Sequence, residues 1–195
     1  MSAQRLGSGI GAVFGLVYVL VNAGPLPRAV SLPLQVLACA AFVVVVIAVA
    51  RADDHGGRPP TAGSRRAYWL IVAAEVAALA AGLAVLNSPL DVPQAGVAWV
   101  SFVVGAHFIA LGAVFREPLF YGLGGAISAC GVIGLALAGA GAGTEAVAVL
   151  GGVVPGVLLL ASGWWGARQA GAHGSPTRSS RPHGPMAWNG TADEC

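Results

Sequence analysis

The chain has 195 residues, of which 56% are hydrophobic and 9% charged, and its formal net charge is +2. Soluble domains carry roughly 25% charged residues, so this composition and a mean hydropathy of +0.78 exclude an ordinary water-soluble domain and indicate a protein whose partner is the lipid bilayer. The small charge does not favour nucleic acid as a partner. All the basic residues are arginine, which excludes lysine chemistry such as Schiff bases and phosphate-binding lysine loops.

Apolar runs of the length that crosses the roughly 30 Å hydrocarbon core follow one another along the chain. They predict an all-α, polytopic transmembrane bundle over residues 1–170, with six spanning helices at about 8–23, 30–50, 67–87, 95–115, 119–140 and 146–167. An alternative interpretation of the first run is a signal peptide cleaved after Val21-Asn22-Ala23. Its glycines are unfavourable for a signal peptide, so we expect a retained first span.

The arginines fall almost entirely on one side of the predicted spans. Nine of the ten lie on the side that holds both termini, and only Arg28 lies on the other. The positive-inside rule therefore predicts that both termini are cytoplasmic. On that side we expect an irregular Gly- and Pro-rich loop at 51–66 and a disordered, solvated tail at 171–195.

Small residues recur at four-residue spacing in two of the predicted spans. Helices in lipid associate through close backbone approach at such residues. The two lines predict seams for helix contact, either within the bundle or with a second copy or another membrane partner. They are Gly7, Gly11 and Gly15 in the first span, and Gly122, Ala126, Cys130, Gly134 and Ala138 in the fifth.

The middle of the sixth span contains Gly152, Pro155 and Gly156. Proline removes a backbone hydrogen bond and glycine weakens its neighbours, so the pattern predicts a kink or a short unwound stretch. In transporters such breaks present backbone groups to substrates or ions. A plain structural kink is the alternative interpretation.

One carboxylate and one imidazole lie deep in the predicted spans. Glu75 follows Arg66 by nine residues and His107 precedes Arg116 by nine residues, so both lie roughly 13 Å from the cytoplasmic boundary. Their spans are joined by the short segment 88–94, which makes a contact possible. An ionisable group at this depth is a functional candidate. The alternatives are a proton or cation relay and a neutral pair that fixes two helices.

Two neighbouring stretches carry a resemblance to a known group of proteins. Val104-Gly105-Ala106-His107-Phe108 is followed by Phe115-Arg116-Glu117-Pro118-Leu119-Phe120-Tyr121 and by Gly124. This run resembles the G-x-H-F…F-R-x-P-x-(F/Y)-Y-x-x-G segment of small uncharacterised bacterial integral membrane proteins. The resemblance implies a polytopic protein of the bacterial inner membrane, and implies no particular substrate. The matching positions are His107, Arg116, Pro118 and Tyr121.

The remaining polar residues do not indicate an enzyme. Arg116 and Glu117 precede Pro118 and predict a tight cytoplasmic turn. The three cysteines have no paired spacing, and His107 has no second deep histidine for haem, so we expect no metal and no cofactor. No nucleophile–base or metal-ligand motif is present, so no catalytic residue is predicted. The hypothesis is transport of a small solute or ion; the alternative is a structural or regulatory membrane subunit.

Overall fold

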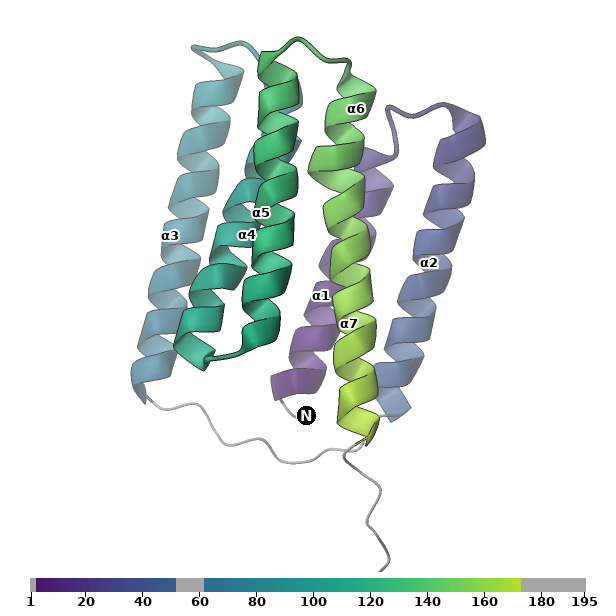
Figure 1. Cartoon of the computed structure of the whole chain (residues 1–195), viewed down its shortest axis with the longest axis vertical. Coiled ribbons are helices and arrows are strands. Elements are labelled where there is room, and N and C mark those ends of the chain that lie inside the picture. The colour runs from purple at the N-terminus through teal and green to yellow at the C-terminus, as the bar shows by residue number, and fades with distance from the viewer. Residues whose placement is uncertain (1–2, 52–61, 173–195) are drawn as a thin grey trace, which may run out of the picture.

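The computed structural model describes residues 3–51 and 62–172. Within these ranges every regular element is a helix, and the helices run side by side in one bundle (Figure 1). The prediction of an all-α bundle is therefore confirmed. The elements are α1 (Ala3–Asn22), α2 (Arg28–Arg51), α3 (Ala62–Asn87), the 3-10 turn η1 (Pro93–Ala95), α4 (Gly96–Phe115), α5 (Pro118–Gly139), α6 (Thr144–Ala148), the π-helix η2 (Val149–Val153) and α7 (Val154–Ala172).

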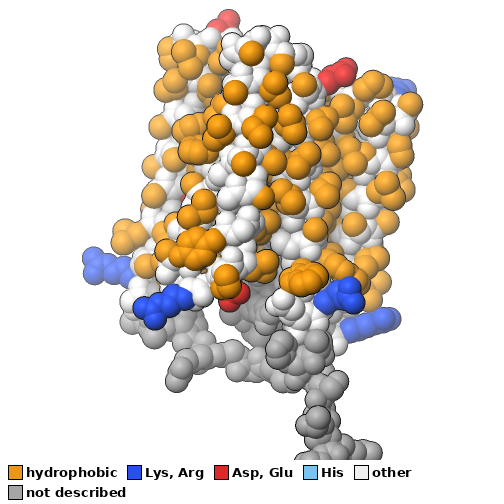
Figure 2. All heavy atoms as spheres, in the orientation of Figure 1, with side chains coloured by type: hydrophobic (Ala, Val, Ile, Leu, Met, Phe, Trp, Pro, Cys, Tyr) orange, Lys and Arg blue, Asp and Glu red, His pale blue; other side chains and the backbone are white. Residues whose placement is uncertain are grey.

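Five helical segments are long and apolar enough to cross a membrane: Arg28–Arg51, Arg65–Asn87, Pro93–Phe115, Pro118–Gly139 and Thr144–Gln169. The apolar part of α1, Gly7–Asn22, is shorter, and crossing of the membrane by α1 stays a prediction. Hydrophobic side chains cover the visible flank of the bundle (Figure 2). A continuous apolar surface of this kind is unfavourable in water. The structure is therefore that of a multi-pass membrane protein.

The helix ends lie close to the predicted boundaries, with two corrections. Helices α2 and α3 extend into the loop expected over 51–66, and α7 extends through residues 171 and 172 of the tail expected to be disordered over 171–195. The helix α3 begins at Ala62, so residues 62–66 are helical. Alanine and arginine are strong helix formers, and a helix can therefore extend past the apolar boundary. Residues 52–61 of that loop lie outside the described residues, as do residues 173–195 of the predicted tail.

The bundle consists of two groups of three helices. In the first group, α1, α2 and α7 pack around Ala12, Val19, Ala38, Val45 and Leu160. The second group, α3, α4 and α5 together with α6, packs around Leu86, Ala95, Ala98, Ala138 and Val147. The helices α2 and α3 lie at opposite edges of the bundle (Figure 1), so the two groups meet through the central helices.

Close approach of α1 and α7 takes place where two glycines face each other. A Cβ on Gly15 would lie 2.7 Å from the carbonyl oxygen of Gly156, and a Cβ on Gly156 would lie 2.9 Å from the carbonyl oxygen of Gly15. A Cβ on Gly7 would meet nothing within 4 Å. The predicted seam on the first span therefore makes a contact between two helices of the same chain, at Gly15.

The seam predicted on the fifth span is used within the bundle at only some of its positions. Gly122 and Ala126 are exposed and Cys130 is half-buried, whereas the buried face of α5 is formed by Gly124, Ile127, Gly131, Gly134 and Ala138. Residues spaced four apart do not stay on one face of a helix. Each step of four turns the position by about 40° beyond a full turn, because one turn takes 3.6 residues. Alternating steps of three and four residues keep the small residues facing α4.

We predict that Gly124→Ala destabilises the bundle by about 1–3 kcal/mol, the usual cost of overpacking. Its new Cβ would lie 2.6 Å from the Gly105 carbonyl oxygen and 2.8 Å from the Ile109 nitrogen. The matched control is Gly125→Ala, where a Cβ meets nothing within 4 Å. Thermal unfolding of the purified protein in detergent measures both; equal unfolding temperatures would contradict the close contact of α4 with α5.

Candidate intramembrane polar site

The register between α3 and α4 is fixed by a tryptophan. The indole Nε1 of Trp99 donates a hydrogen bond of 3.1 Å to the carbonyl oxygen of Ala78. The same ring occupies the space that a Cβ on Gly82 would need. Since the two helices are antiparallel, this contact sets which residues face each other further along the pair.

The register brings the predicted intramembrane residues together. His107 Nδ1 lies 3.0 Å from Glu75 Oε2, and the two side chains are 14% and 20% exposed. Both residues are in the middle part of their helices. The N–H direction is not aligned as a hydrogen bond, which leaves Nδ1 buried without a hydrogen-bond partner. The two side chains are therefore in close contact without an aligned hydrogen bond.

A tyrosine from the other group of helices reaches the same region. The hydroxyl of Tyr18, on α1, is buried and has no partner in hydrogen-bonding geometry. It lies near the hydroxyl of Ser101, and the Glu75 carboxylate acts on it electrostatically. The polar site therefore joins α1 to α3 and α4, at the junction of the two helix groups.

The predicted helix break lies beside this cluster. At this place the structure has the π-helix η2, and the helix then continues as α7 through Pro155. In an α-helix the N–H of residue 155 would donate to the Gly151 carbonyl, and proline has no N–H. The buried Ser101 hydroxyl donates to that carbonyl instead. A side chain on α4 thus compensates for the proline.

The C-terminal end of α1 packs on the same π-helix. A Cβ on Gly152 would collide with the side chain of Asn22, 2.7 Å from its Nδ2. The Asn22 amide also donates a hydrogen bond of 2.8 Å to the Tyr18 carbonyl oxygen. The glycine at 152 is therefore required by close packing, and Asn22 helps to hold the turn of α1 that carries Tyr18.

The predicted turn residues lie away from this site. Arg116 and Glu117 are exposed between α4 and α5, and Pro118 is the first residue of α5. Arg116 adopts a left-handed conformation, with φ of 56°, and its N–H donates to the Gly112 carbonyl as the cap of α4. The turn closes a helix hairpin and takes no part in the polar cluster.

Two members of the cluster were not predicted from the sequence, Tyr18 and Ser101. Each is a single polar residue in an apolar run, and such residues more often satisfy their hydrogen bonds within their own helix. One signal in the sequence could have pointed to such a donor. Pro155 follows Gly151 by four residues, so the Gly151 carbonyl loses its usual helical N–H donor and needs another one. Among the described residues no group of three or more His, Cys, Asp or Glu side chains is placed to hold a metal ion.

Comparisons with known protein families, with curated proteins and with solved structures find no match for this chain.

We predict that Ser101→Ala destabilises the protein by about 1–3 kcal/mol, because a buried carbonyl loses its side-chain donor. In a Pro155→Ala background the same change should cost less, since residue 155 regains an N–H. Ser128→Ala is the control, because its bond to the Phe102 carbonyl is long, at 3.4 Å. Thermal unfolding of the four combinations at positions 101 and 155 measures the coupling; additive effects would contradict this compensation.

Proposed function

We propose that this chain is a bacterial inner-membrane protein that moves protons across the bilayer, with Glu75 as the proton carrier and His107 as its partner. The contact between these two ionisable side chains in the middle of the bundle carries the proposal. A lone charge at such depth is unfavourable and usually marks a transport path or a proton relay. A histidine beside a carboxylate can exchange a proton with it near neutral pH.

The surroundings of the pair support a relay. The Tyr18 hydroxyl lies near Ser101, the Glu75 carboxylate acts on it electrostatically, and Ser101 donates to the backbone of the π-helix. These hydroxyl groups extend the polar region from the pair towards Gly151, where backbone geometry is irregular. Irregular backbone at membrane depth is tolerated where it is buried in protein or lines a cavity, and it is common at the binding sites of transporters.

The distribution of arginines supports an orientation with both termini in the cytoplasm. One end of the bundle holds the end of α2, the start of α3, the turn between α4 and α5 and the end of α7 (Figure 1). Basic side chains gather at that end (Figure 2). The positive-inside rule assigns such an end to the cytoplasm, which places the 88–94 loop outside.

Cysteine labelling in intact bacterial cells tests the orientation. We expect a membrane-impermeant maleimide to label Ser88→Cys, in the exposed turn after α3, and to label Cys195 only after the membrane is permeabilised. Cys195→Ser, combined with the Ser88 change, separates the two signals. Labelling of Cys195 in intact cells would reverse the proposed orientation.

Proton flux in sealed liposomes tests the transport function. We expect wild-type protein to dissipate a pH gradient, and Glu75→Gln to slow that flux by about 100-fold, the low end for loss of a positioned proton donor and acceptor. His107→Ala should also slow the flux, because it removes the partner in contact with Glu75. A pH-sensitive dye trapped in the liposomes measures the rate.

Glu117→Gln is the matched control, because Glu117 is an exposed carboxylate in the turn between α4 and α5. It should leave the flux unchanged. Absence of flux in folded wild-type protein would overturn the proton-transport proposal.

The alternative is a structural or regulatory subunit, favoured by the fact that the Glu75–His107 contact and the Trp99 bond both tie α3 to α4. In that case Glu75→Gln and His107→Ala lower the unfolding temperature and no flux is found.

A further inference from the structure

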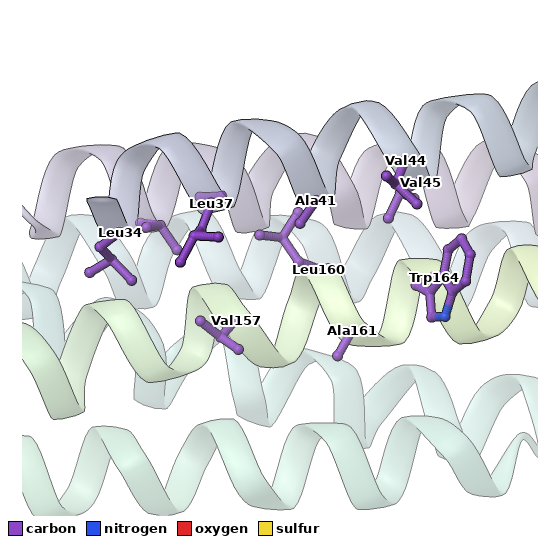
Figure 3. A pocket seen from close by; sticks show the side chains of 11 residues that line it. Leu34, Leu37, Ala41, Val44, Val45, Val157, Leu160, Ala161 and Trp164 are labelled. Carbon is purple, nitrogen blue, oxygen red and sulfur yellow. The ribbon is translucent and has the colours of Figure 1, made fainter. Parts of the chain in front are cut away.

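An apolar groove lies between α2 and α7, separate from the polar site. It has a volume of about 470 Å³, and its floor includes Val19 of α1. Figure 3 shows side chains of the two helices along its walls. The wall residues Leu37 and Val157 are 67% and 48% exposed, so the groove opens on the outer surface of the bundle, which faces lipid in a membrane.

Both walls of the groove continue into an arginine at the same end of the bundle. On α2, Leu37, Val44 and Arg51 follow one another at seven-residue spacing, which keeps them on one face of a helix. On α7, Trp164 lines the groove, and the Arg168 guanidinium lies 5.6 Å from the centre of its ring. Arg51 and Arg168 thus follow the two walls of the groove at the same end of the bundle.

We propose that this groove binds one acyl chain of an anionic phospholipid, with the lipid phosphate held by Arg168 and Arg51. Guanidinium groups bind phosphate oxygens through two parallel hydrogen bonds. Arg168 contributes more than Arg51, because Asp53 and Asp54 follow Arg51 in the sequence. This site is independent of the proposed proton transport.

The charge at the end of the groove favours a phospholipid over a second copy of the protein. The α2 wall runs from Leu34 to Val45, roughly 16 Å at 1.5 Å per residue. An extended hydrocarbon chain can follow a groove of this length, and an anionic headgroup complements the arginines beyond its end.

Native mass spectrometry of the full chain in detergent tests the proposal. The probes are phosphatidylglycerol and phosphatidylcholine with identical acyl chains, added in equal amounts. We expect wild-type protein to retain phosphatidylglycerol preferentially. Arg168→Gln should weaken that binding about fivefold, the effect of one arginine near an anionic headgroup, and Arg51→Gln should weaken it less. Arg116→Gln, an exposed arginine at the same end of the bundle, should have no effect.

A second pair of variants tests the groove itself. Ala41→Phe places a ring in the groove and should reduce the binding of both lipids, whereas Ala40→Phe, at the exposed neighbouring position that does not line it, should not. Equal retention of the two lipids by wild-type protein, or equal effects of Arg168→Gln and Arg116→Gln, would overturn the proposal. A dimer that Ala41→Phe dissociates, with lipid binding unchanged, would assign the groove to a second copy.

Discussion

Close approach of helix backbones at small residues is the constraint on which this bundle depends. Lipid tails are as apolar as the helix surfaces, so burial of apolar area does not hold the helices together. Contact must come from backbones that approach closely enough for dense packing. Gly15 against Gly156 provides this in one group of helices, and Gly124 against Gly105 in the other. Side chains that project from the central helices are then brought within contact distance.

The polar site follows from this closeness. With α1, α4 and the π-helix packed together, Ser101 reaches the Gly151 carbonyl that Pro155 leaves without its usual donor. In hydrocarbon an unpaired carbonyl is costly, so the serine and the proline depend on each other. The same packing brings Tyr18 to the edge of the Glu75–His107 pair. One irregular turn therefore determines where the polar groups of three helices meet.

The sequence was sufficient to predict where the helices begin and end. It was much less sufficient to predict which face of each helix packs against its neighbours. Apolar length is a property of a single segment, so the spans were predicted to within a few residues. That Glu75 and His107 lie level with each other was also predictable, because it depends only on residue counts from the flanking arginines. Their contact, however, depends on rotation of α3 about its axis, which Trp99 fixes through Ala78. The buried face of α5 was not predicted for the same reason, since a small error in helical period changes which face is assigned.

The polar residues of the cluster are divided between the two helix groups. The edge helix α3 packs chiefly on α4, whereas Tyr18 belongs to the group of α1, α2 and α7. A shift of one group against the other would move the Tyr18 hydroxyl relative to Glu75 without breaking the contact between α3 and α4. Among the described residues, His107 Nδ1 and the Tyr18 hydroxyl are buried side-chain atoms without a hydrogen-bond partner. They belong to different helix groups, His107 to α4 and Tyr18 to α1, so the unsatisfied polar atoms of the bundle are divided between the two groups at the place where those groups meet.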